Sequence, residues 1–137
     1  GAIIPPMAKK RILAVDDDAS ICDFYSQSLK LLGYDVETAA NARKAKEALT
    51  RQKPDLILMD IMMPDQDGIS LTRELRADPK TSDVPIIVVS GLADAGTLND
   101  ALLFGAVDYV VKPVDVDALQ AKMERTFAAL EKRKKPS

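Results

Sequence analysis

The sequence of 137 residues contains no histidine and no tryptophan, and it has a single cysteine, Cys22. The absence of histidine excludes His-based acid–base catalysis and His-ligated metal sites. One cysteine cannot form an internal disulfide, so we expect a cytoplasmic protein in which Cys22 is an inert thiol on an early helix. No apolar run approaches the roughly 20 residues of a membrane span, and no signal-peptide pattern is present. We therefore expect no membrane association.

The composition is that of an ordinary globular domain, with 47% apolar and 29% charged residues. The net charge of −2 gives no broad attraction to nucleic acid, so we expect no direct nucleic-acid contact by this domain. We place one domain at residues 9–131. Residues 1–8 are interpreted as a leader that is partly a cloning remnant. The basic residues 132–137 are either a solvated helix end or the start of a linker.

Short apolar runs alternate with longer segments of helical period. The expected strands are residues 12–15, 34–38, 56–59, 84–89 and 109–111, of which 34–38 alternates like an edge strand. The expected helices are residues 20–32, a segment opened by Asn41, a segment after Gly68, residues 94–104, and a segment from Asp115. This alternation predicts an α/β fold, a (βα)₅ doubly wound, parallel five-stranded sheet in the flavodoxin-like order 2-1-3-4-5.

Five chemically reactive side chains follow the expected strands at their carboxyl ends. They are Asp16, Asp17, Asp60, Ser90 and Lys112. Open parallel sheets place their sites at this edge, near the point where the strand order reverses. An Asp after a strand is also a common turn residue or helix N-cap, and we assign that role to Asp18. Capping does not account for a set that also includes a serine and a lysine.

The three acids predict a site for Mg²⁺, with Mn²⁺ as an alternative, because hard cations prefer carboxylate oxygens. With its charge screened, Asp60 could attack phosphorus as a carboxylate nucleophile. Lys112 and the Ser90 hydroxyl could then bind phosphoryl oxygens. Pro64 stiffens the following loop, which could hold the backbone carbonyl of Met62 toward the metal.

Four segments together resemble the response-regulator receiver domain. They are Val15-Asp16-Asp17-Asp18, Leu58-Met59-Asp60-Ile61-Met62-Met63-Pro64 with Asp67-Gly68, Val89-Ser90-Gly91, and Asp108-Tyr109-Val110-Val111-Lys112-Pro113. The resemblance covers residues 9–131 and implies a phosphoryl-accepting switch of a two-component signalling system, not an enzyme in its own right. By this resemblance, Asp60 is the phospho-acceptor and Asp17 contacts Mg²⁺ directly, with Asp16 acting through water.

The resemblance also implies roles for the remaining positions. The Met62 carbonyl would be a metal ligand, Ser90 the switch hydroxyl, Lys112 the phosphate partner, and Tyr109 an aromatic that turns inward on activation. It further implies a cis Lys112–Pro113 bond. The phosphoryl donor would be a sensor histidine kinase or a phosphotransfer protein. The output would be a repacked face of strand 4, helix 4 and strand 5 for partner binding or dimerisation, and a homodimer would form through helix 4, strand 5 and helix 5.

Two pairs of apolar residues occupy positions that are often polar in this family. Met62 and Leu92 flank the line of water attack, and neither can orient a water molecule, so we predict slow self-dephosphorylation. On the helix expected at 94–104, helical spacing turns Leu102 toward the sheet and Leu103 outward. Leu103 and Val107 then predict an apolar contact patch on the output face, although scattered exposed leucines are also normal.

Two other functions remain open from the residues alone. A Mg²⁺-dependent phosphohydrolase of the haloacid-dehalogenase kind also uses a nucleophilic Asp with Ser/Thr and Lys. Such enzymes typically need a second Asp two residues later, where this chain has Met62. A phosphorylation-independent interaction domain is the third alternative, and it is disfavoured because every chemical position is filled. The sequence does not identify the cognate kinase, the stimulus or an output domain.

Overall fold

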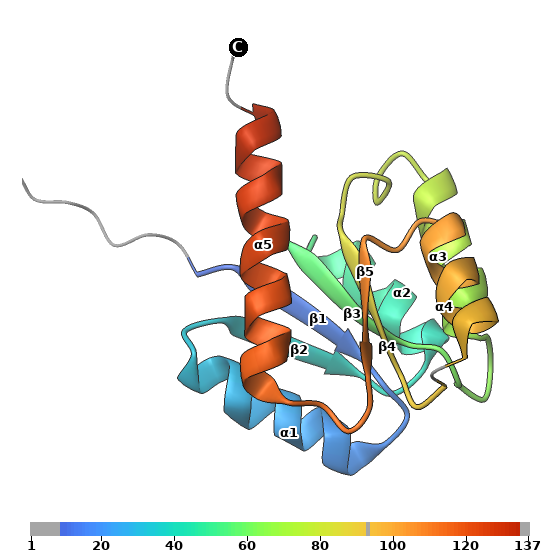
Figure 1. Ribbon diagram of the computed structural model, residues 1–137, viewed down its shortest axis with the longest axis horizontal. Helices are drawn as coiled ribbons and strands as arrows, with labels where there is room; N and C mark the ends of the chain where they lie inside the picture. Colours follow the sequence, from blue (N-terminus) through green and yellow to red (C-terminus); the bar gives the residue numbers. More distant parts are fainter. Residues whose placement is uncertain (1–8, 93, 135–137) are drawn as a thin grey trace, which may run out of the picture.

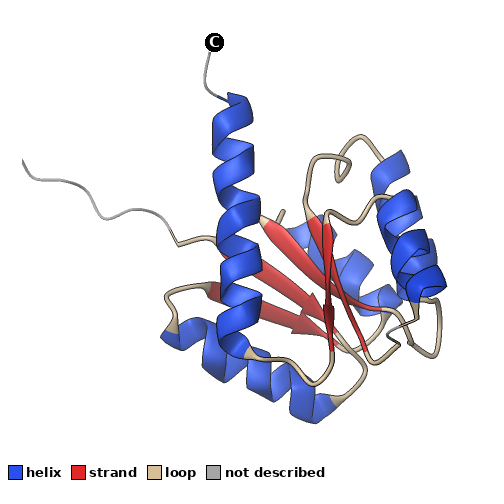
Figure 2. Cartoon of the chain, viewed as in Figure 1, coloured by secondary structure: helices blue, strands red, loops and turns tan. Residues whose placement is uncertain are grey.

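The computed structural model describes residues 9–92 and 94–134. The leader predicted at residues 1–8 and the last residues of the tail, 135–137, lie outside the described residues. Figures 1 and 2 show a sheet flanked by helices on both faces. The predicted α/β architecture is confirmed.

Strands and helices alternate along the whole described chain. The strands are β1 (Arg11–Val15), β2 (Asp35–Ala39), β3 (Leu56–Asp60), β4 (Ile86–Ser90) and β5 (Asp108–Val111). The helices are α1 (Ala19–Leu31), α2 (Ala42–Arg51), α3 (Gly68–Ala77), α4 (Ala95–Leu103) and α5 (Val116–Lys134). All strand pairs are parallel and the order is β2-β1-β3-β4-β5, as predicted. The order reverses between β1 and β3, whose carboxyl ends carry the acids.

Two apolar layers hold the helices on the sheet (Figure 1). On one face, α2, α3 and α4 pack on alternate residues of the strands, with Ala45, Leu71 and Ala101 in the core. On the other face, α1 and α5 bury Leu29 and Met123. The central strands β3 and β4 are buried at every position, which explains why their sequences are continuous apolar runs.

Four helices begin at an N-cap residue whose side chain accepts a backbone hydrogen bond. Asp18, Asn41, Asp67 and Asp94 each accept a hydrogen bond from a backbone N–H in the first turn of their helix. The assignments of Asp18 and Asn41 as N-caps are therefore confirmed. The chain leaves α1 through Gly33, whose φ of +96° suits the left-handed turn expected there.

Two local expectations are wrong. Strand 4 starts at Ile86 and not at Val84, because Pro85 has no N–H to donate to the ladder. Helix α4 turns Ala101 toward the sheet, with 0% exposure, whereas Leu102 is 41% exposed. A small residue lets the helix approach the sheet closely, so the larger Leu102 is displaced to the rim.

Helix α5 continues to Lys134, so the first three residues of the basic tail are helical. Their cations lie near the negative end of the helix dipole. Within residues 9–92 and 94–134, no helix combines the length and the apolar character required to cross a membrane.

Candidate functional site

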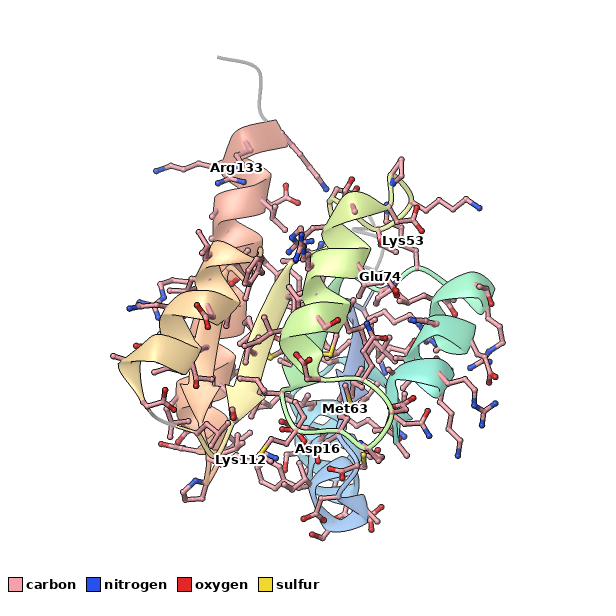
Figure 3. All side chains as sticks on the ribbon, turned by 90° about the vertical axis from the view of Figure 1, so that its right-hand side faces the viewer. Asp16, Lys53, Met63, Glu74, Lys112 and Arg133 are labelled. Carbon is pink, nitrogen blue, oxygen red and sulfur yellow. The ribbon has the colours of Figure 1, made fainter. Side chains whose placement is uncertain are left out.

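The three predicted acids converge at the carboxyl edge of the sheet. Asp16 and Asp17 follow β1, and Asp60 is the last residue of the neighbouring strand β3. One carboxylate oxygen from each acid lies within 4.8 Å of those of the other two. Asp16 and Asp60 are buried, while Asp17 is exposed. Figure 3 shows Asp16, Met63 and Lys112 at the same end of the molecule, far from Arg133.

Lys112 brings a cation to this cluster from the end of β5. Its Nζ lies 2.9 Å from Asp16 Oδ2 and 3.4 Å from Asp60 Oδ1. Asp16 Oδ2 is the oxygen that faces this ammonium and forms the ion pair with it. The carboxylate oxygens gathered at this edge are also the ligands that a hard cation prefers. The Lys112–Pro113 peptide bond is cis, as the family resemblance implied.

Burial and neighbouring charges shift the pKa values of Asp60 and Lys112. Burial, followed by the charge of Asp16, raises the pKa of Asp60 to about 6, although Lys112 opposes the rise. Burial acts to lower the pKa of Lys112, but its contacts with Asp16 and Asp60 outweigh burial and raise it. Lys112 is therefore a permanent cation, and Asp60 is a carboxylate whose charge is costly without a further positive partner.

Ser90 lies at the end of β4, beside β5. Its side chain is 1% exposed, and its Oγ accepts a hydrogen bond from the N–H of Leu92 at 3.0 Å. Leu92 is 38% exposed, and Met62 is 64% exposed. Both apolar side chains thus reach solvent on loops that follow the site strands, which is where the sequence placed them.

The loop from β3 to α3 is closed tightly at its base. The N–H of Gly68 donates to the carbonyl of Ile61 at 2.7 Å. A Cβ at Gly68 would collide with the backbone carbonyl of Asp60, so only glycine fits. Sequence reasoning missed Asp65 on this loop, whose carboxylate bonds to helix α2. No local pattern signals a bond to a helix that begins more than twenty residues earlier in the chain.

Cys22 also contacts the site, which the sequence did not indicate. The Cys22 Sγ donates to the carbonyl oxygen of Asp16 at 3.2 Å. Burial and the nearby charge of Asp16 raise the pKa of the Cys22 thiol. A thiol held in its protonated form is a poor nucleophile, which agrees with the expected structural role.

Tyr109 on β5 is half-buried against the core between α4 and the sheet. The ammonium of Lys122 lies 5.0 Å from its ring centroid and donates to its backbone carbonyl at 2.7 Å. On the adjoining face, Leu103 is 76% exposed and Val107 is 49% exposed. The predicted outward position of Leu103 is confirmed.

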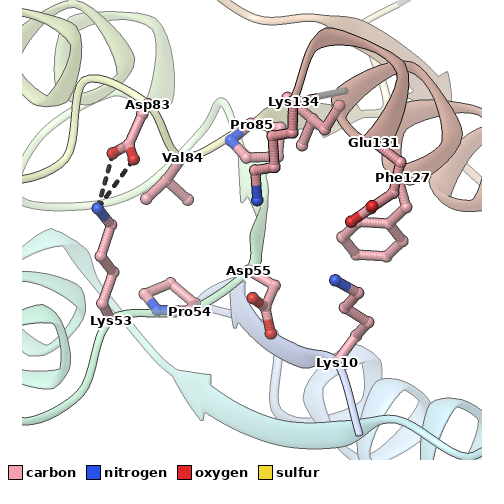
Figure 4. Close-up of a pocket in the computed structure, with 11 residues that line it drawn as sticks. Lys10, Lys53, Pro54, Asp55, Asp83, Val84, Pro85, Phe127, Glu131 and Lys134 are labelled. Carbon is pink, nitrogen blue, oxygen red and sulfur yellow. Dashed lines mark hydrogen bonds and ion pairs between the residues drawn. The ribbon is translucent and has the colours of Figure 1, made fainter. Parts of the chain in front are cut away.

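A separate cavity of about 340 Å³ lies at the amino-terminal edge of the sheet, opposite the acids (Figure 4). Lys53 and Asp83 form an ion pair of 2.8 Å on its wall. Prolines and Phe127 line the rest together with opposed charges. The ammonium of Lys10 lies 5.3 Å from the ring centroid of Phe127. The clustered carboxylates and Lys112 lie at the other edge of the sheet.

The structure is a doubly wound α/β protein with three acids and a lysine at the carboxyl edge of its sheet. Residues 12–124 match the response regulator receiver domain family, and the chain belongs to that family. It is similar to a receiver domain protein (CheY-like) from Methanospirillum hungatei JF-1, with a TM-score of 0.85 and 33% identity. That match covers 92% of this chain and 99% of the solved chain. The chain is thus a receiver domain of two-component signalling, and receiver domains are signalling switches.

Curated relatives extend the likeness to transcriptional regulators. The probable transcriptional regulator ycf27 of Porphyridium aerugineum is 39% identical over 126 residues, which are 92% of this chain and 51% of the relative. The DNA-binding dual master transcriptional regulator RpaA of Synechocystis is 36% identical over 113 residues, 82% of this chain and 47% of the relative. The chain therefore spans about half the length of these relatives.

Proposed function

We propose that this receiver accepts a phosphoryl group on Asp60. The observation that carries the proposal is the convergence of the Asp16, Asp17 and Asp60 carboxylates within 4.8 Å, with the Lys112 ammonium beside two of them. A carboxylate oxygen of Asp60 would form the new P–O bond. The bond from phosphorus to the donor would break, and its electron pair would leave with the donor. The product is an aspartyl phosphate.

The donor is a phosphohistidine of a sensor histidine kinase or a phosphotransfer protein. This chain has no histidine of its own, so the phosphohistidine must come from a partner. The leaving imidazole would carry away the electron pair of the P–N bond and would take a proton from water. The residues of the acceptor site do not specify which kinase or phosphotransfer protein is the donor.

The residues present fit a divalent cation, because one carboxylate oxygen from each of Asp16, Asp17 and Asp60 lies within 4.8 Å of the other two. Asp16, Asp17, Asp60 and the Met62 carbonyl would hold Mg²⁺, or Mn²⁺ in its place. When bound, the ion supplies positive charge that offsets the acids and the incoming phosphoryl oxygens. Lys112 would turn from Asp16 toward the phosphoryl group as a mobile point charge.

Ser90 and Tyr109 would change position in response to the phosphoryl charge, and this would alter the surface around α4 and β5. Phosphorylation adds about −1.5 to −2 charge, and the Ser90 hydroxyl would leave the Leu92 N–H to donate to a phosphoryl oxygen. Tyr109 would then turn inward, and α4, β5 and α5 would repack. The exposed Leu103 and Val107 make this face the site for a protein partner or a second copy of the chain. We assign no direct nucleic-acid contact to this domain.

The proposal is tested by the intact mass of the protein after incubation with Mg²⁺ and acetyl phosphate. A stable adduct of one phosphoryl group that is absent in Asp60→Asn supports the switch. Rapid turnover of acetyl phosphate without an adduct would identify a phosphohydrolase. Absence of both adduct and turnover would identify a phosphorylation-independent interaction domain.

A further inference from the structure

The amino terminus of helix α2 is capped from two different parts of the chain. Its own N-cap, Asn41, accepts the N–H of Lys44 at 2.8 Å. The other acceptor is Asp65, on the loop between β3 and α3, which receives the N–H of Ala42 at 3.1 Å and of Arg43 at 3.0 Å. Both carboxylate oxygens of Asp65 are therefore bonded to the helix.

This contact is favourable because a carboxylate meets the positive end of a helix dipole. The hydrogen bonds from the N–H groups of Arg43 and Ala42 hold the pKa of Asp65 below its usual value. The anchor also belongs to the acidic edge. Ala39, the last residue of β2, lies just before α2, and its carbonyl accepts the N–H of Asp16 at 3.0 Å. The same corner of the fold therefore contacts Asp16 and the loop after Asp60.

The loop that Asp65 anchors also carries Met62. At its base, the loop is closed by the Gly68–Ile61 hydrogen bond. At its middle, the Met62 side chain and Pro64 are exposed and add little packing. Met63 packs on the core, and Asp65 supplies the hydrogen bonds that join the loop to another element. The Met62 backbone therefore lies between the closed base of the loop and the side that Asp65 ties to α2.

We propose that Asp65 is a positioning residue of the phosphoryl-transfer site. By tying the β3–α3 loop to α2, it holds the Met62 carbonyl where it can complete the set of oxygen ligands around the acids. This inference rests on the proposed function, because it takes Met62 as a ligand. Residues that orient ligands without touching the metal typically change metal affinity by about 10- to 100-fold.

The test compares three full-length variants by calorimetric titration with Mg²⁺ in the absence of any phosphoryl donor. Asp65→Ala frees the loop, and its dissociation constant for Mg²⁺ should rise about tenfold. Asn41→Ala removes a cap from the same helix but leaves the loop anchored. Asp67→Ala removes an equal charge from the same loop, where Asp67 caps α3 through Ser70. Both controls should bind Mg²⁺ within about twofold of the wild type.

Two further measurements separate positioning from general damage. At low Mg²⁺, we expect Asp65→Ala to be phosphorylated by acetyl phosphate more slowly than the wild type. Saturating Mg²⁺ should restore the wild-type rate, because the variant is impaired in metal binding. Amide exchange should be accelerated at Ala42 and Arg43. If Asp65→Ala unfolds, Asp65→Asn, which retains one acceptor oxygen, should show an intermediate dissociation constant.

The inference is overturned if Asp65→Ala binds Mg²⁺ as the wild type does. It is also overturned if either control loses as much affinity, which would assign the effect to helix stability or to charge. Absence of Mg²⁺ binding and of phosphorylation in the wild type would overturn the proposed function and this inference together. Wild-type binding with an unaffected Asp65→Ala variant would overturn this inference alone.

Discussion

Lys112 lies closer to Asp16 than to Asp60, at 2.9 Å against 3.4 Å. Lys112 therefore neutralises the charge of Asp16, which is 1% exposed, and offsets the charge of Asp60 only in part. Burial and the charge of Asp16 raise the pKa of Asp60 to about 6, and the more distant Lys112 offsets only part of that rise. The arrangement also leaves Lys112 able to move toward Asp60 once another charge appears there.

Replacing Lys112 should destabilise the metal-free protein. Lys112→Met leaves the buried Asp16 carboxylate without its cation. Because Lys112 itself is 21% exposed, we expect the free energy of unfolding in EDTA to fall by about 3 kcal/mol, the lower end of the cost of breaking a buried ion pair. Mg²⁺ should recover part of the loss by binding the folded state. Urea denaturation measures both effects. The matched control is Lys46→Met, whose partner Glu74 is 49% exposed, and it should cost less than about 1 kcal/mol. Equal losses would contradict the account.

Asp60→Asn should stabilise the metal-free protein above pH 6. The pKa of Asp60 is about 6 in the folded state, against an ordinary value of 3.8 that we take for the unfolded chain. The folded state therefore binds the Asp60 proton more tightly than the unfolded state does. Wild-type stability should therefore fall as pH rises from about 4 to about 6, and the variant should lack this fall. At pH 8 the variant should gain about 1–3 kcal/mol, an upper range set by the pKa difference.

The control for this pH profile is Asp23→Asn, which removes one exposed carboxylate on α1. Its stability should follow the wild type across the same range. Denaturation at a series of pH values in EDTA gives both curves. A profile of Asp60→Asn that runs parallel to the wild type would show that Asp60 is not the perturbed group.

The sheet and the acidic edge were predictable because they follow from strand period and from parallel topology. Asp16, Asp60 and Lys112 end strands, and the carboxyl ends of parallel strands share one edge. The register of α4 was not predictable, since Ala101 and Leu102 are both apolar and only close packing selects the smaller one. The hydrogen bonds between Asp65 and α2 were also not predictable, because they join two segments that are distant in the sequence and share no local pattern.

If Met62 and Leu92 flank the attacking water as we propose, polar groups at these two positions should shorten the lifetime of the aspartyl phosphate. Met62 and Leu92 are exposed and cannot orient a water molecule. Met62→Asn or Leu92→Glu should speed loss of phosphate by about tenfold, equivalent to about 1.4 kcal/mol of activation energy. Intact mass, followed after removal of acetyl phosphate, measures the decay. Leu103→Lys is the remote control and should decay like the wild type. Unchanged phosphoryl lifetimes in both Met62→Asn and Leu92→Glu would contradict this prediction.

Self-association through α4, β5 and α5 should depend on Leu103. This side chain is 76% exposed beside Val107 at 49%, an apolar pair on a face that we expect to repack. With a phosphoryl mimic, the sedimentation coefficient of the wild type should rise with protein concentration, because burying Leu103 removes apolar area from water. Leu103→Lys should remain monomeric, while Leu31→Lys, which replaces a leucine of 89% exposure on α1, away from this face, should behave like the wild type. Concentration-independent monomers of both wild type and Leu103→Lys would refute self-association, and the exposed pair would then serve a different protein partner.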